Sequence, residues 1–185
     1  MNILELTGRD KHHLVQLCLP IEKAKKGIEF PVLASEKLDG VFGLIVANKC
    51  HGYVFSRTGE MYLSLNHICK EAIKLAELCN ETVVFVAELY ARKVDQPTIS
   101  GWCRDTKEQH PQVNAFIHDF FTFEEFRQGT SESTFDSRTT QLMSLFRMCK
   151  TPLTSIERVP QTMFFWRHDL QAYAQFIWDN GGEGV

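Results

Sequence analysis

The chain has 185 residues, of which 44% are hydrophobic, and its formal net charge is −3. A chain of this size can bury a hydrophobic core, and we expect one globular domain. The small negative charge excludes a generally basic coat for nucleic acid but leaves room for a local patch. Lys23, Lys25 and Lys26 are candidates for such a patch, and a solvated helix face explains them equally well.

The six cysteines are scattered and form no Cys-x-x-Cys pair, which is typical of free thiols in a reducing compartment. Cys50-His51 and His67-x-Cys69 could be drawn as a zinc site, but they fall on different predicted elements and lack finger spacing. The sequence shows neither a secretory leader pattern nor an apolar run of membrane-spanning length. We therefore expect a soluble, cytoplasmic protein without a membrane partner.

The first third of the chain predicts strands on both sides of a charged cluster. Scattered leucines and charges over residues 9–27 suggest one or two short helices. Apolar runs at 30–34 and 44–47 are typical of strands, so the cluster at 35–43 is predicted to be the turn between them. Another strand is expected over residues 53–56.

The remainder mixes helices and strands without repeats. Asn66 is a fair N-cap for a helix over 67–79, and 82–91 is a strongly apolar strand that contains one carboxylate. A Pro-, Gly- and charge-rich connection is expected over 95–111, before a strand over 113–121. The later expected elements are helices over 123–126, 141–148 and 170–178, strands over 156–159 and 163–166, and a polar loop over 129–137. This irregular order indicates an α+β fold.

Lys37 lies at the centre of the charged cluster, where it could act as a nucleophile. A lysine amine is protonated at neutral pH, so neighbouring groups or desolvation must free it before it can attack. Asp39 points to the same face if the segment is extended, and Gly40 lets the backbone pass close to a ligand. Without further evidence, Lys37 and Asp39 would be explained as an exposed turn pair that contributes little energy.

The segment Lys37-Leu38-Asp39-Gly40 resembles motif I of the covalent nucleotidyltransferases, which are the DNA ligases, RNA ligases and mRNA capping enzymes. Later segments resemble further motifs of this family in the family's order: Ser56-Arg57-Thr58-Gly59 motif Ia, Glu88 motif III, Phe116-Ile117-His118-Asp119 motif IIIa, and Gly182-Glu183-Gly184-Val185 the start of motif IV. Each match is weak alone, and the ordered set makes the resemblance specific.

The resemblance implies a fold and an activity. The family's fold is a nucleotidyltransferase fold, ATP-grasp-like, with antiparallel sheets flanked by helices. Within the family, the small phage-type ATP-dependent DNA ligases are the most similar. Because only a short segment precedes Lys37, we do not expect the N-terminal domain of NAD-dependent bacterial ligases. The resemblance also implies that residues 1–185 form the adenylylation domain.

By the same resemblance, Lys37 attacks the α-phosphate of ATP and holds AMP as a phosphoramidate, and Asp39 assists the lysine and Mg²⁺. The AMP then passes to the 5′-phosphate of nicked double-stranded DNA, and the 3′-hydroxyl displaces it. The remaining implied roles are nucleotide binding by Ser35, Glu36, Arg57, Glu88 and His118, and metal binding by Glu183. Among these, Arg57 would contact phosphate and Glu88 the ribose, since a buried carboxylate needs a partner or a ligand.

The chain departs from the family pattern at three places. Phe42 stands where motif I of DNA ligases usually continues to an arginine, and His118 stands where an aromatic residue usually stacks on adenine. Phe116 is the alternative stacking residue. The chain also stops at Val185, inside motif IV, so motif V and the C-terminal OB-fold are expected on a missing segment or on a separate subunit.

Two alternative functions remain open from the sequence. One is an RNA ligase or a capping-type nucleotidyltransferase, which would differ in nucleotide and acceptor. The other is a non-catalytic nucleotidyltransferase-like module, which Phe42 and the missing motif V favour. The five motif residues Lys37, Asp39, Arg57, Glu88 and Glu183 argue against that second alternative.

Overall fold

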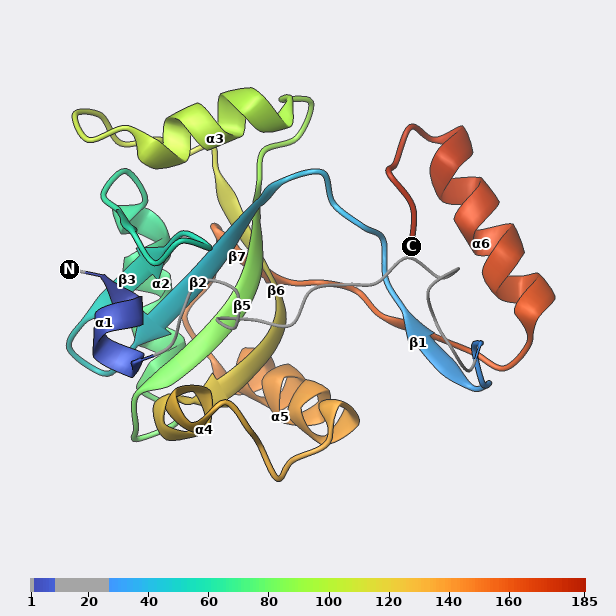
Figure 1. Cartoon of the computed structure of the whole chain (residues 1–185), viewed down its shortest axis with the longest axis horizontal. Helices are drawn as coiled ribbons and strands as arrows, with labels where there is room; N and C mark the ends of the chain where they lie inside the picture. The colour runs from blue at the N-terminus through green and yellow to red at the C-terminus, as the bar shows by residue number, and fades with distance from the viewer. Residues whose placement is uncertain (1, 9–26) are drawn as a thin grey trace. The chain divides into compact units, whose positions relative to one another are not determined.

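The computed structural model describes residues 2–8 and 27–185, which form two compact units (Figure 1). The larger unit contains the described residues up to Gly8 together with Gly40–Arg158, and the smaller unit contains residues 27–39 and 159–185. The helices predicted over residues 9–27 lie almost entirely outside the described residues.

The larger unit is built on a six-stranded sheet in the order β4-β3-β2-β5-β6-β7. Neighbouring strands are antiparallel except β6 and β7, which run parallel. The strands are β2 (Val41–Ala47), β3 (Gly52–Phe55), β4 (Met61–Tyr62), β5 (Val83–Tyr90), β6 (Asn114–Thr122) and β7 (Ile156–Arg158). The expectation of an α+β fold with antiparallel sheets is confirmed.

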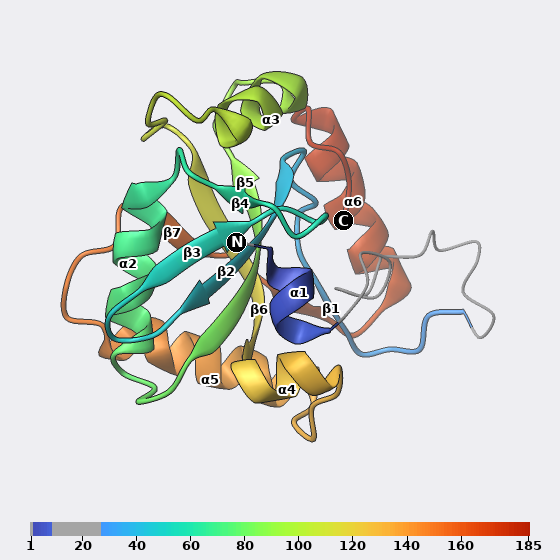
Figure 2. The ribbon, with the colours of Figure 1, turned by 60° about the vertical axis from the view of Figure 1, so that its left-hand side comes forward.

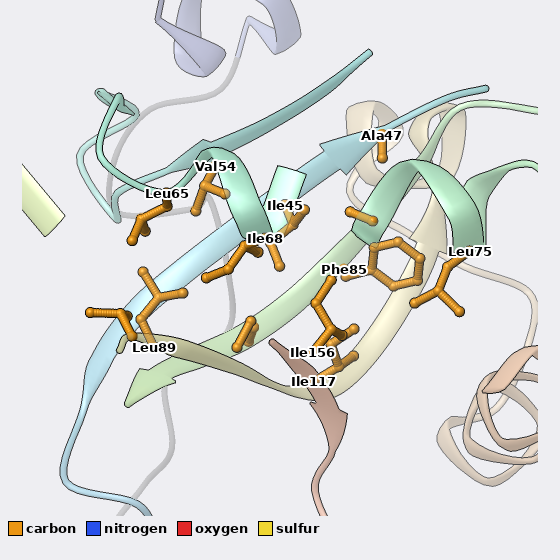
Figure 3. Packing of buried hydrophobic residues seen from close by; sticks show 14 of the residues in the cluster. Ile45, Ala47, Val54, Leu65, Ile68, Leu75, Phe85, Leu89, Ile117 and Ile156 are labelled. Atoms are coloured by element: carbon orange, nitrogen blue, oxygen red, sulfur yellow. The ribbon is translucent and has the colours of Figure 1, made fainter. Parts of the chain in front are cut away.

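One face of this sheet carries the hydrophobic core. The helices of the unit are α1 (Ile3–Thr7), α2 (Asn66–Ala76), α3 (Gln96–Arg104), α4 (Phe123–Gln128) and α5 (Phe135–Met148). Helix α2 runs alongside β2 and β3 (Figure 2). Figure 3 shows Ile45, Phe85 and Ile117 of three neighbouring strands with Ile68 and Leu75 of α2, and all five are fully buried. Because side chains alternate along a strand, the residues between them face the opposite side.

The buried carboxylate of Glu71 joins α2 to the segment that leads into β7. Glu71 is 7% exposed and accepts hydrogen bonds from the backbone N–H groups of Thr154, Ser155 and Ile156, at 2.8 to 3.0 Å. The Thr154 hydroxyl donates a further bond of 2.9 Å. Burial alone would raise the pKa of Glu71, but these hydrogen bonds together lower the pKa below its usual value. The carboxylate thereby fixes the start of an edge strand.

The smaller unit has a two-stranded antiparallel sheet and one described helix. Strand β1 (Val32–Ala34) pairs with β8 (Thr162–Phe164), and Val32 lies opposite Phe164. Helix α6 (Arg167–Asp179) follows, and the ring of its Tyr173 lies 5.2 Å from that of Phe164. This ring contact packs α6 against the sheet.

The predicted turn around Lys37 is wrong. Both flanking strands form, but β1 pairs with β8 while β2 pairs with β3 and β5, so the two strands belong to separate sheets. Residues 35–39 connect the two strands and have no regular secondary structure. Local apolar patterning predicted the core of each strand, although β2 begins at Val41 inside the expected turn. Such patterning holds no information about the distant strand with which each strand pairs.

One unexpected helix and two helix starts differ from the sequence-based expectation. The connection expected over 95–111 contains α3, whose N-cap Asp95 accepts a 3.0 Å bond from the Thr98 N–H. Pro97 lies in the first turn, where its missing N–H is not needed. Helix α5 begins inside the loop expected over 129–137, capped by Thr134, and Leu65 rather than Asn66 occupies the N-cap position of α2.

Candidate active site

Lys37 contacts the C-terminal segment of the chain within the smaller unit. Its backbone N–H donates a 2.8 Å hydrogen bond to the carbonyl of Gly184, and its Nζ forms an ion pair with the carboxylate of Glu183. The side chains of Lys37 and Glu183 are 56% and 41% exposed. The segments that resemble motifs I and IV, which come from distant parts of the sequence, are therefore in direct contact.

The end of α6 directs the chain towards Lys37. Gly181 has a left-handed φ of 81°, and the N–H of Gly182 donates to the carbonyl of Ile177 at 2.9 Å. A Cβ on Gly182 would collide with the Ile177 side chain and lie 3.2 Å from Glu36 Oε1, so a glycine is needed where this segment passes Glu36. Trp178 Nε1 then donates to the carbonyl of Glu183 at 3.2 Å.

The other predicted residues of this segment lie beside Lys37 along the chain. Ser35 is half-buried, whereas Glu36 and Asp39 are exposed. The ion-pair partner of Lys37 is Glu183 rather than Asp39. Asp39 is thus an exposed carboxylate two residues from the candidate nucleophile.

In the larger unit, the predicted site residue Glu88 lies in a row with Phe42 and Phe116 across the central strands. Phe42 on β2 lies opposite Glu88 on β5, and Glu88 lies opposite Phe116 on β6. Cross-strand partners share a face, so the row lies on the face opposite the hydrophobic core. Gly40 approaches this row closely: a Cβ there would lie 2.5 Å from the carbonyl oxygen of Leu89 and 2.8 Å from Glu88 Cγ. The segments that resemble motifs I and III therefore meet at a point where only glycine fits.

Arg57 reaches the same row from the tight turn between β3 and β4. The N–H of Ser56 donates to Glu60 O at 2.8 Å, and Gly59 has a left-handed φ of 84° and donates to Ser56 O at 3.0 Å. This turn exposes Arg57, whose Cζ lies 5.2 Å from the centroid of the Phe42 ring. The Phe42 position, where the family resemblance expects an arginine, is thus covered by an arginine from another strand connection.

His118 lies at a β-bulge on β6. Ala87 pairs with Ile117 and Val86 with Asp119, so His118 is the extra residue between two consecutive pairs. Burial lowers the pKa of His118, and the nearby charge of Asp119 opposes this effect. The net effect favours the neutral form of the imidazole.

Asp119, the last residue of the segment that resembles motif IIIa, is held by Arg138. The Nε and Nη2 atoms of Arg138 each donate a 2.8 Å bond to one oxygen of the Asp119 carboxylate. This ion pair raises the pKa of Arg138. A bidentate ion pair of this kind is among the strongest side-chain interactions, and it fixes α5 to β6. Neither Arg138 nor Glu71 was predicted from the sequence, because neither belongs to a motif and their partners are distant along the chain.

Residues 2–8 and 27–185 contain no cluster of three or more His, Cys, Asp or Glu side chains that could hold a metal ion. Magnesium does not require such a cluster, because it is commonly bound through one or two carboxylates together with substrate phosphates and water. The exposed carboxylate of Glu183 fits that mode. In the same part of the chain, no helix is both long and apolar enough to cross a membrane.

Comparison with solved structures identifies the fold. No protein-family model and no curated protein matches the sequence. A structure described as Pmar-Lig_Pre superimposes with a TM-score of 0.74 and 16% identity, over 82% of this chain and 36% of the other. The ATP-dependent DNA ligase of bacteriophage T7 in complex with ATP gives 0.68 and 18%, over 82% and 54% of the two chains. The Chlorella virus DNA ligase-adenylate gives 0.62 and 14%, over 91% and 56%.

The fold is that of the nucleotidyltransferase domain of ATP-dependent DNA ligases, as the sequence motifs predicted. The chain spans about a third to just over half of the length of these three structures. At 14 to 18% identity, the likeness describes the fold, and the chemistry must be argued from the residues themselves.

Proposed function

We propose that this chain is the adenylylation domain of an ATP-dependent DNA ligase, which forms a covalent lysyl-AMP at Lys37. The observation that carries this proposal is the contact of Lys37 with Glu183 and Gly184. It joins a candidate nucleophile to a candidate metal-binding carboxylate, within a chain that has the fold of DNA ligase nucleotidyltransferase domains.

In the proposed first step, the Nζ of Lys37 attacks the α-phosphorus of ATP. A P–N bond forms, the bond from the α-phosphorus to the oxygen that bridges it to the β-phosphorus breaks, and pyrophosphate leaves. To attack, Lys37 must lose a proton and leave its ion pair with Glu183. The ion pair is solvent-exposed, so separating the two groups costs little, on the order of 1 kcal/mol or less.

The remaining site residues would hold the nucleotide in line for attack. Arg57 is exposed and offers guanidinium donors to phosphate oxygens, and Glu88 would accept hydrogen bonds from the ribose hydroxyls. His118 or Phe116 would stack on adenine, with Ser35 and Glu36 providing further nucleotide contacts. Positioning of this kind accounts for much of the catalysis in phosphoryl and nucleotidyl transfer.

Glu183 would hold a magnesium ion, and Asp39 would assist from the segment that carries Lys37. Bound there with ATP, the ion would neutralise the charge that develops on the phosphate oxygens. The residues fit this role because both carboxylates are accessible to solvent.

The later proposed steps require nicked double-stranded DNA. The AMP on Lys37 would pass to the 5′-phosphate of the nick, and the 3′-hydroxyl would then displace it to seal the strand. Residues 1–185 would provide the nucleotidyltransferase domain, and an OB-fold segment or subunit would hold the DNA. Phe165, Trp166 and Phe176 of the smaller unit are 61%, 65% and 64% exposed, and aromatic groups this exposed favour an interaction partner.

Incubation with α-labelled ATP and magnesium, with labelled GTP and NAD in parallel, tests the proposal directly. We expect label from ATP that survives denaturation and that disappears in Lys37→Ala. Lys49→Ala is the matched control, because Lys49 is also an exposed lysine of the chain. Absence of label from every donor with an OB-fold protein present, or label that persists in Lys37→Ala, would overturn the proposal.

The acceptor is tested separately with nicked duplexes whose 5′-phosphate strand is either DNA or RNA. We expect AMP to move from the labelled protein to the DNA strand. Transfer only to RNA ends would replace the DNA ligase assignment with an RNA ligase, while leaving the lysyl-AMP step intact.

A further inference from the structure

The contact between Arg57 and Phe42 offers a role for a residue that breaks the family pattern. Phe42 is half-buried on β2 and faces Glu88 across the strands, whereas Arg57 is exposed in the turn between β3 and β4. The Arg57 Cζ lies 5.2 Å from the Phe42 ring centroid, within the range of a cation–π interaction.

The ring orders the guanidinium without occupying its hydrogen-bond donors. Within residues 2–8 and 27–185, Arg57 forms no ion pair with a carboxylate. An aromatic face attracts the positive charge but accepts no conventional hydrogen bond, so the N–H groups stay available for an oxyanion. An exposed arginine loses much rotamer freedom when it binds a ligand, and a contact that restricts it beforehand lowers that loss.

A second cation–π contact in the same unit shows the opposite arrangement. Arg138 Cζ lies 4.6 Å from the Phe121 ring centroid, but its donors are used by the Asp119 carboxylate and the carbonyl of Ser133. Arg138 is therefore a structural residue. Of these two arginines, Arg57 combines an ordering ring with donors that remain open to a ligand.

We propose that Phe42 is a positioning residue that holds the Arg57 guanidinium for the phosphates of the bound nucleoside triphosphate. This inference rests on the proposed nucleotidyltransferase function. Phe42 itself touches no phosphate. The family resemblance expects an arginine at position 42 that would contact the nucleotide directly. Here the Phe42 ring takes the place of that contact by ordering Arg57, which comes from the turn between β3 and β4.

The test compares Phe42→Leu, which removes the ring, with Phe42→Tyr, which keeps it. We expect Phe42→Leu to raise the KM for ATP in lysyl-AMP formation about two- to five-fold, the range of a partly exposed cation–π contact, with little change in kcat. Phe42→Tyr should retain the wild-type KM. Phe121→Leu is the matched control, since it removes a ring contact of Arg138 rather than of Arg57 and should leave the KM unchanged.

Two further measurements separate positioning from a general structural effect. Equilibrium binding of ATP should weaken in Phe42→Leu, whereas binding of adenosine, which has no phosphate, should not. In the Arg57→Ala background, Phe42→Leu should have no additional effect on ATP binding, because the two residues act through one contact. An unchanged KM in Phe42→Leu, an equal loss with adenosine, or additive effects in the double variant would each overturn the inference.

Failure of this inference can be distinguished from failure of the proposed function. The Arg57 side-chain NMR signals should shift when the ring current of Phe42 is removed, whether or not the protein transfers nucleotides. A wild-type protein that forms no lysyl-AMP with an OB-fold protein present would contradict the function. A protein that forms it with an unaltered KM in Phe42→Leu would contradict only the role of Phe42.

Discussion

The amine of Lys37 and the carboxylate of Glu183 form an ion pair, next to a backbone hydrogen bond from Lys37 to Gly184. The two residues come from the two separate chain segments that make up the described part of the smaller unit, and both remain partly exposed. An exposed pair of this kind contributes about 0 to 1 kcal/mol to stability. The contact therefore has little value as a structural element, which favours a functional reason for it.

Replacement of Glu183 separates these two possibilities. We predict that Glu183→Gln lowers the rate of lysyl-AMP formation by at least about ten-fold, because removing a group that stabilises charge in the transition state typically costs this much or more. The free energy of unfolding should change by less than about 1 kcal/mol. Glu29→Gln, an exposed glutamate of the same unit, is the control. Equal rates in the two variants would show that Glu183 has no role in the transfer.

Gly40 should tolerate no side chain, because a Cβ would lie 2.5 Å from Leu89 O and 2.8 Å from Glu88 Cγ. We predict that Gly40→Ala destabilises the protein by about 1 to 3 kcal/mol, as overpacking usually does, and weakens ATP binding by displacing Glu88. Urea unfolding and equilibrium binding measure the two effects.

Gly101→Ala is the matched control for this substitution. Gly101 lies in α3, and a Cβ at this position would meet no other atom within 4 Å. Alanine there should therefore be neutral or should stabilise the helix by up to about 1 kcal/mol. If Gly40→Ala behaves like Gly101→Ala, the close approach of Gly40 to Glu88 has no consequence for stability or binding.

The sequence was most informative where the signal is local. The central residues of β2, β5 and β6 were predicted to be strands, because each lies in a run of consecutive apolar residues. The pairing of β1 with β8 joins residues far apart in the sequence and could not be predicted from a single chain. Helix α3 was missed for a different reason: Pro97 was interpreted as a loop signal, although proline is favourable in a first helical turn.

The same distinction applies to the candidate site. Family resemblance selected Lys37, Arg57, Glu88 and Glu183, and the structure places Lys37 against Glu183. Resemblance could give no account of Phe42, because the arginine whose guanidinium lies over its ring comes from a separate turn. The assignment of these residues to nucleotide and metal binding stays a prediction.

His118 provides a prediction with a defined pH dependence. Burial lowers the pKa of its imidazole below the value of about 6.5 for an exposed histidine. The unfolded chain therefore takes up a proton at higher pH than the folded chain, so this group reduces stability as the pH falls through about 6.5. We predict that His118→Phe removes this component and keeps ATP binding at pH 7.5, since a phenyl ring can also stack on adenine. Urea unfolding of both proteins between pH 5 and 8 measures the first effect. An identical pH profile for the two proteins would show that His118 does not contribute.

Glu71 should show the opposite kind of pH dependence, because hydrogen bonds from Thr154, Ser155 and Ile156 outweigh its burial and lower its pKa. Its contribution to stability is fully present above the pKa of about 4.3 of an unfolded glutamate, and it is lost as the pH falls through the lower pKa of the folded state. We predict that Glu71→Gln destabilises the protein at pH 7 by about 1.5 to 3 kcal/mol, the range for hydrogen bonds to a charged group.

The difference in stability between wild type and Glu71→Gln should shrink below about pH 4, where the wild-type carboxylate becomes protonated as well. Glu77→Gln, at the exposed C-terminal end of the same helix, is the control and should change stability by less than about 0.5 kcal/mol. A difference that is small at pH 7, or that does not change with pH, would mean that the Thr154–Ile156 segment is held by its neighbouring strand pairing. In that case the carboxylate of Glu71 would not be what fixes the start of β7.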